Sequence, residues 1–230
     1  MNLEKFAVPI AILIAGSLMA GALYISNIKS NSSAKNTTNT ETSLGKIRKI
    51  TSNDHILGNP NAKLLIVEYS DTECPYCKMF HNTMHKIVSE YGSNGDVAWV
   101  YRHFPIDQLH PKSRKEAEAT ECANEIGGPA KFWEYINMVY EKTPANDGLD
   151  PAQLPIFARA IGINVDTFNS CLSSSKYAKK VEADYEDGIA TGGVGTPHTI
   201  LVSQDGTQTP LEGAYPYSQL KTIINTALNK

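Results

Sequence analysis

The motif Cys74-Pro75-Tyr76-Cys77 stands between an apolar run and a helical pattern, and this placement constrains the chain more than any other feature. The apolar run covers residues 64–67, and apolar residues recur at helical spacing over 79–91. Because proline suits a first helical turn, we expect Cys74 at the helix N-terminus, where unpaired backbone N–H groups stabilise a thiolate. Cys77 follows one turn later and can close a disulfide with Cys74. The pattern therefore predicts a thiol–disulfide redox site.

Metal binding is the competing interpretation of this region, because paired cysteines also bind zinc. Zinc would require Cys122 and Cys171 as further ligands, and these stand singly in separate helix-like segments. Since the sequence has no second Cys-x-x-Cys, the pattern favours the redox site and no metal or cofactor is predicted. A separate hypothesis places copper or zinc on the helix face that His81 and His85 share with Cys77.

The N-terminal residues 1–28 predict export. Residues 6–28 carry no charged side chain over a length that can cross a bilayer. One interpretation is an uncleaved membrane anchor, and the other is a signal peptide cleaved near 20–22. The length of the apolar run favours the anchor. We therefore expect a catalytic domain outside the cytoplasm, held at the membrane or, after cleavage, secreted.

Residues 29–50 are predicted to form a polar linker, since 30–43 contain no large apolar side chain. An exported domain with four cysteines suits an oxidising compartment, so Cys122 and Cys171 are expected to form a structural disulfide. The net charge is −3 with both signs interspersed, and no basic stripe is present, so nucleic acid is not an expected partner.

The order of predicted elements is strand, helix, strand, a helical block, two strands and a helix. Strands are predicted at 63–69, 97–104, 198–202 and 209–212, with helices at 75–91 and 217–229. The block over 112–191 contains predicted helices at 112–126, 130–141, 151–161, 165–172 and 176–191. This order predicts an α/β fold, in which a mixed sheet built from 51–111 and 192–230 is flanked by helices and interrupted by an all-helical insertion.

Four blocks of sequence make the chain resemble the DsbA family of thioredoxin-fold oxidoreductases, in its exported or membrane-anchored bacterial branch. They are 67–71 with the cysteine motif, 101–105, the cysteine-bearing insertion, and Gly193-Val194-Gly195-Thr196-Pro197. The resemblance covers 52–229 and implies a thioredoxin-like fold with an inserted helical domain. It also implies an enzyme that acts on unfolded or reduced exported polypeptides and is reoxidised by a membrane quinone-linked partner.

The resemblance implies roles for single residues as well. Pro197 would be a cis proline beside the redox pair, and the Thr196 backbone would pair with bound peptide. Pro75 and Tyr76 would complete the substrate-binding surface. Glu68, on the strand that leads to the motif, would be a buried acid that exchanges protons with Cys77.

The dipeptide Pro75-Tyr76 departs from the Pro-His pair typical of strongly oxidising DsbA proteins. We therefore expect a milder oxidant. Disulfide formation is the favoured activity, and disulfide isomerisation or reduction and metal handling remain as alternatives.

Overall fold

A five-stranded mixed sheet forms the centre of residues 45–229, the part of the chain that the computed structural model describes. The strand order is β1–β3–β2–β4–β5, in which β2 and β3 are parallel and the other neighbours antiparallel. The strands are β1 (His55–Leu57), β2 (Leu64–Ser70), β3 (Val97–His103), β4 (His198–Ser203) and β5 (Gln208–Glu212). A β-α-β unit and an antiparallel hairpin therefore share one sheet, as the sequence predicted.

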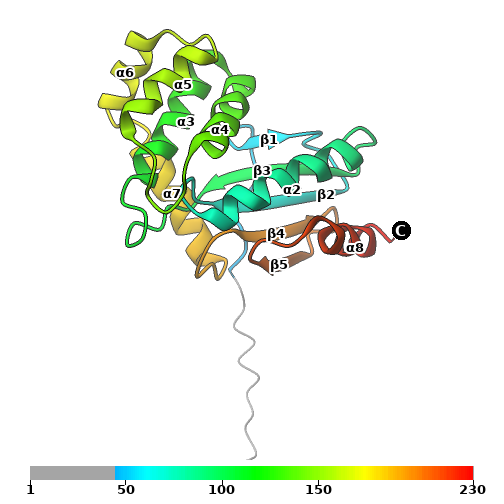
Figure 1. Ribbon diagram of the computed structural model, residues 1–230. Coiled ribbons are helices and arrows are strands. Elements are labelled where there is room, and N and C mark those ends of the chain that lie inside the picture. The colour runs from blue at the N-terminus through cyan, green and yellow to red at the C-terminus, as the bar shows by residue number, and fades with distance from the viewer. Residues whose placement is uncertain (1–44, 230) are drawn as a thin grey trace, which may run out of the picture. The chain divides into compact units, whose positions relative to one another are not determined.

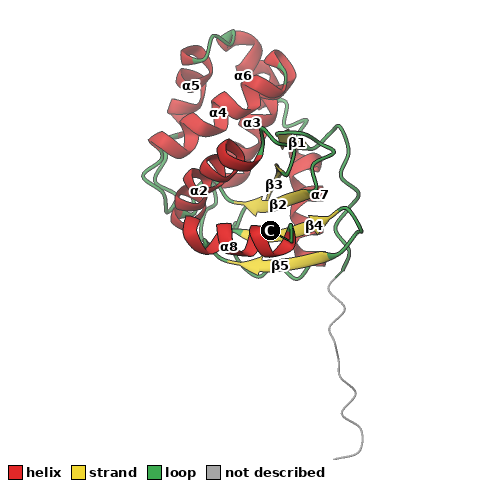
Figure 2. Ribbon diagram, turned by 90° about the vertical axis from the view of Figure 1, so that its right-hand side faces the viewer, coloured by secondary structure: helices red, strands yellow, loops and turns green. Residues whose placement is uncertain are grey.

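Helices cover both faces of this sheet (Figures 1 and 2). Helix α2 (Pro75–Tyr91) packs beside α8 (Tyr217–Ala227) on one face, and α7 (Ala178–Ala190) lies against β2 and β3 on the other. Every residue of β3 is consequently buried, as expected of a parallel strand with both faces covered. The core between the sheet and α2 includes Leu64, Ile66, Trp99, Phe80, Met84, Ile87, Leu220 and Ile224.

The segment between β3 and β4 is helical, as predicted for 112–191. It contains α3 (Ser113–Gly127), α4 (Pro129–Lys142), a 3-10 turn η1 (Pro151–Gln153), α5 (Leu154–Ala160), α6 (Val165–Ser173) and α7. Figure 1 shows α3 to α6 gathered beyond one end of the sheet. They enclose a second core, to which Ala119, Tyr135, Phe157 and Phe168 belong.

The helix predicted over 151–161 is divided into the turn η1 and the helix α5. Pro155 explains the division, because it has no backbone N–H to donate to the carbonyl of residue 151. The other predicted elements that form helices or strands in these residues begin and end within two residues of the expected bounds.

Residues 45–50, the end of the predicted polar linker, lie against the folded domain. The Gly45 N–H donates to the carbonyl of Ala190 at 3.0 Å, and Arg48 Nη2 lies 2.7 Å from Asp184 Oδ1. Ile47 and Ile50 pack on a third apolar cluster around β2, β3 and β4. This end of the predicted linker carries apolar side chains, so burying them favours contact over solvation.

The buried side chain of Arg102, on β3, ties the same segment to the sheet. Its Nε donates to Asp54 Oδ1 at 2.8 Å, its Nη1 to Asp187 Oδ2 at 2.5 Å, and its Nη2 to the Arg48 carbonyl at 3.1 Å. The predicted anchor or signal peptide, 1–28, lies outside the described residues. Within 45–229, none of the helices is both long and apolar enough to cross a membrane.

Candidate active site

Cys74 is the N-cap residue of α2, and Pro75 lies in the first turn, as the sequence predicted. Both Cys74 and Cys77 are free thiols in this structure. Cys77 is fully buried, whereas Cys74 is 6% exposed. Cys74 is therefore the sulfur of the pair that a substrate can approach.

The two thiols have opposite pKa shifts. A hydrogen bond from the Cys77 thiol, assisted by the backbone N–H groups of Tyr76 and Cys77, lowers the pKa of Cys74 to about 6. Burial raises the pKa of Cys77 well above its usual range. At neutral pH Cys74 is thus mainly a thiolate, the form that acts as nucleophile and leaving group, while Cys77 keeps its proton.

The loop before β4 meets the Cys74 sulfur. Cys74 Sγ lies 3.4 Å from the carbonyl oxygen of Thr196, and the peptide bond between Thr196 and Pro197 is cis. The sequence blocks that carry Cys74 and Pro197 are far apart in the chain, and the pairing of β2 with β4 brings them together.

Glu68 is fully buried on β2, and burial raises the pKa of its carboxyl to about 8. Its charge also contributes to the raised pKa of Cys77. Ser70 Oγ donates to Glu68 Oε1 at 2.7 Å and lies 2.9 Å from the hydroxyl of Tyr140. The Tyr140 hydroxyl in turn lies 3.1 Å from that of Tyr101.

Sequence reasoning did not single out Ser70, Tyr101 or Tyr140. Ser70 and Tyr101 stand inside the blocks of sequence that carry the resemblance. Ser70 comes two positions after Glu68 on the same strand, and this spacing was a weak signal that it belongs to the site. Tyr140 comes from α4 in the insertion, and nothing in the spacing of the chain connects it with Glu68.

The two segments that meet at the reactive sulfur, the cysteine motif and the loop before β4, each carry an exposed apolar side chain. Tyr76, between the cysteines, is 59% exposed, and Val194, two residues before Thr196, is 92% exposed. Exposed apolar surface of this kind suits contact with a polypeptide substrate.

Cys122 and Cys171 are joined by a disulfide that links α3 to α6, with their Cα atoms 5.9 Å apart. Both sulfurs lie in the core of the helical insertion, which contains neither Cys74 nor Cys77.

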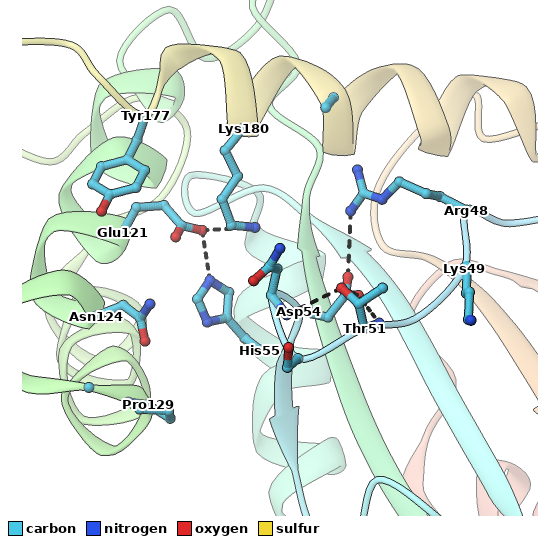
Figure 3. Close-up of a pocket in the computed structure, with 14 residues that line it drawn as sticks. Arg48, Lys49, Thr51, Asp54, His55, Glu121, Asn124, Pro129, Tyr177 and Lys180 are labelled. Atoms are coloured by element: carbon cyan, nitrogen blue, oxygen red, sulfur yellow. Dashed lines mark hydrogen bonds and ion pairs between the residues drawn. The ribbon is translucent and has the colours of Figure 1, made fainter.

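A pocket of about 770 Å³ lies away from this motif and is lined from the N-terminal segment, α3 and α7 (Figure 3). Glu121 and His55 line this pocket, and Glu121 Oε1 lies 2.7 Å from His55 Nε2 and 3.0 Å from Nε2 of His103, a grouping that resembles a metal site. However, the ammonium of Lys180 lies 3.3 Å from the same oxygen. Three donors thus surround one carboxylate oxygen. The positive charge of Lys180 balances the negative charge of the carboxylate, as a metal ion would.

Comparisons with known proteins agree with this geometry. A family model described as thioredoxin matches residues 50–226. The crystal structure of DsbA2 from Pseudomonas aeruginosa is similar with a TM-score of 0.66 and 26% identity, over 77% of this chain and 96% of that one. BdbD from Bacillus subtilis, in its oxidised form, has a similar fold with a TM-score of 0.69 and 24% identity, over 81% of this chain and 98% of that one.

Curated relatives include proteins named Na⁺/H⁺ antiporter NhaA. One from Mycolicibacterium gilvum is 32% identical over 163 residues, which are 70% of this chain and 25% of the antiporter. One from Salinispora tropica is 32% identical over 144 residues, which are 63% of this chain and 21% of the antiporter. The chain spans about a quarter or less of the length of these relatives.

Proposed function

The chain belongs to the thioredoxin family, and we propose that it is a DsbA-like thiol:disulfide oxidoreductase in which Cys74 and Cys77 are the redox pair. Its fold is the thioredoxin-like mixed sheet with a helical insertion that DsbA proteins share. One observation carries the proposal: Cys74 has a lowered pKa at the N-terminus of α2, beside the Thr196 carbonyl, while Cys77 is buried next to it.

The reaction starts from the oxidised enzyme. A substrate thiolate attacks Cys74 Sγ, the Cys74–Cys77 bond breaks, and Cys77 takes up a proton. A second substrate thiolate then attacks the substrate sulfur of this mixed disulfide, and Cys74 departs as a stabilised thiolate. The substrate loses two electrons and gains a disulfide, and the enzyme is left with the reduced pair. A membrane quinone-linked partner reoxidises this pair.

Glu68 supplies the proton for Cys77. Its carboxyl is protonated at neutral pH because burial raises its pKa to about 8, and its charge acts on the pKa of Cys77. The Ser70 hydroxyl donates to this carboxyl, and the Tyr140 hydroxyl contacts that of Ser70, so the two residues hold the carboxyl in place.

Reduced exported polypeptides are the substrates. The backbone of Thr196 pairs with the bound segment, and Pro75, Tyr76 and Pro197 form the surface around Cys74. Export follows from residues 1–28, which anchor the catalytic domain outside the cytoplasm. The disulfide between Cys122 and Cys171 has a structural role in the insertion.

Disulfide isomerisation or reduction is the second candidate activity, and the Pro75-Tyr76 dipeptide favours it over strong oxidation. The pKa of Cys74, about 6, is above the ~3.5 of the strongly oxidising DsbA and below the ~7 of thioredoxin. A less stabilised thiolate makes the reduced form less favourable. We therefore expect a reduction potential more negative than the approximately −120 mV of DsbA.

The test is oxidation of a reduced peptide with two cysteines by the oxidised enzyme, measured together with the reduction potential in glutathione buffers. Rapid oxidation by the wild type, lost in Cys74→Ser, is the expected result. Rearrangement of a scrambled disulfide substrate without net oxidation would favour isomerisation. Equal rates for the wild type and Cys74→Ser in both assays would refute an oxidoreductase.

A further inference from the structure

Two imidazoles of α2 converge on one side chain of α4. His81 Nε2 and His85 Nε2 each lie 2.7 Å from Asn137 Oδ1, and they lie 3.2 Å from each other. Cys77, which shares their helix face, is not part of the group, because its sulfur meets Cys74 and the backbone N–H of Asp71. The third group beside the two imidazoles is therefore an amide oxygen from the insertion, and not the Cys77 sulfur that the helical spacing suggested.

Hydrogen bonding cannot satisfy all three contacts of this triangle. If both ring nitrogens carry hydrogen, they fill the two lone pairs of Asn137 Oδ1, and no hydrogen bond joins the two rings. If one ring nitrogen is bare, its lone pair faces the lone pairs of that oxygen. If the amide is turned over, its two N–H groups require two bare ring nitrogens, and these then face each other. In every assignment, one of the three contacts joins two donors or two acceptors.

A cation facing three lone pairs satisfies the same three atoms at once. We propose that His81, His85 and Asn137 bind one divalent transition-metal ion of borderline softness, Zn²⁺ or Cu²⁺, between α2 and α4. Imidazole nitrogen is a preferred ligand of both ions, and an amide oxygen with water completes the coordination.

The distances fit such an ion. Two ligands at about 2.1 Å from one metal, at angles of about 90–110°, lie about 3.0–3.4 Å apart. The 3.2 Å between the two ring nitrogens is within this range. The two contacts of 2.7 Å to Asn137 need to open by about 0.3 Å, which a small change in one side-chain torsion provides.

The surroundings allow an ion to enter. A cavity of about 480 Å³ is lined by His81, His85 and Asn137, with Lys78 and Glu141 among its other residues. These two bear opposite charges, and the Lys78 ammonium is held by the Thr143 carbonyl at 2.6 Å. The His81 ring is buried beside this cavity. Its Nδ1 has no hydrogen-bond partner among the described residues, so no second contact fixes the tautomer.

The experiment titrates Cu²⁺ or Zn²⁺ into the full chain with Cys74 and Cys77 oxidised, so that no thiolate competes. We expect one equivalent of Cu²⁺, with nitrogen hyperfine coupling from two imidazoles in its electron paramagnetic resonance spectrum. Metal should also raise the melting temperature, because it binds the folded state. Neither measurement involves turnover, so their outcome is separate from that of the oxidoreductase assay.

Three variants locate the ion. His85→Gln should weaken binding about tenfold or more and abolish the two-nitrogen coupling. Asn137→Asp should tighten binding about tenfold, because a carboxylate adds charge attraction. His55→Gln, which removes an imidazole from the pocket of Figure 3, should leave binding unchanged.

The proposal is overturned if the folded wild type binds neither ion. It is also overturned if His85→Gln and Asn137→Asp both bind as the wild type does, or if only His55→Gln loses binding. Should His85→Gln fail to fold, the affinity of Asn137→Asp decides, since a structural role for Asn137 gives no gain in metal affinity.

Discussion

At the scale of single residues, the two sulfurs of one motif differ because their surroundings differ. Cys74 is an N-cap residue that receives hydrogen bonds, and its pKa is lowered to about 6, whereas burial raises the pKa of Cys77. This asymmetry supports the proposal that Cys74 is the nucleophile and Cys77 the resolving thiol.

Cys77→Ser should therefore trap mixed disulfides between Cys74 and substrates, because no second thiol remains to release them. Cys74→Ser should trap almost none, since Cys77 is buried and protonated. Non-reducing gels after incubation with a peptide disulfide measure the difference. Equal trapping by the two variants would contradict the assignment.

Glu68 should make the folded state less stable as pH rises. Its pKa is about 8 when folded, against the usual 4.5 of a glutamate carboxyl, so its contribution is complete below pH 4.5 and lost as pH rises towards 8. Glu68→Gln removes this dependence. Relative to the wild type, the variant should gain about 3–4 kcal/mol in unfolding free energy between pH 5 and pH 8.

Denaturant unfolding of the oxidised proteins at the two pH values measures this gain. Oxidation is needed because Cys74 titrates in the reduced protein with the opposite sign: its folded pKa is lowered, so it adds stability as pH rises. A constant difference between Glu68→Gln and the wild type across this window would show that Glu68 ionises normally.

At the scale of elements, α4 connects the insertion with the redox site. The Tyr140 hydroxyl contacts the hydroxyls of Ser70 and Tyr101, and it lies 3.3 Å from the carbonyl oxygen of Asp71. Tyr135, also buried on α4, donates instead to the Leu154 carbonyl within the insertion, which makes it a matched control.

Tyr140→Phe and Tyr135→Phe should each cost about 1 kcal/mol of stability, since each loses buried hydrogen bonding. Only Tyr140→Phe should also move the pH profile of peptide oxidation, because Ser70, which bonds Glu68, loses a partner. Measuring kcat/KM from pH 6 to 9 separates the two roles. The same profile shift in both variants would mean that stability alone explains it.

At the scale of the whole molecule, two of the three apolar cores in residues 45–229 have different roles. One supports the sheet and α2, and the other lies inside the insertion around its disulfide. Replacing both Cys122 and Cys171 with Ala should cost about 2–4 kcal/mol, since the bond closes a long loop in the unfolded chain. Thermal unfolding should show the loss, while peptide oxidation below the melting temperature stays near the wild-type rate. Loss of activity at unchanged stability would instead indicate electron transfer between the two cysteine pairs.

Features governed by neighbours along the chain were predictable from the sequence. The start of α2 at Pro75, the N-cap position of Cys74 and the helix and strand bounds depend on local spacing, proline and turn residues. The resemblance added the expectation that Pro197 is cis, and that peptide bond is cis in the structure. The division of the helix at Pro155 was also predictable, because the proline is visible in the sequence. The helical spacing of the apolar residues nevertheless led to the prediction of one continuous helix over 151–161.

Other features depend on how segments that are distant in the chain pack together, and the local spacing of residues does not predict that packing. The contact of Thr196 with Cys74 follows from β4 pairing with β2. The Tyr140 hydroxyl reaches Ser70, and Asn137 reaches His81 and His85, only because α4 packs against α2. The sequence by itself determined the reactive motif and the elements around it. The tertiary structure decided which side chains from the insertion surround that motif, because apolar burial, rather than residue spacing, sets the position of α4.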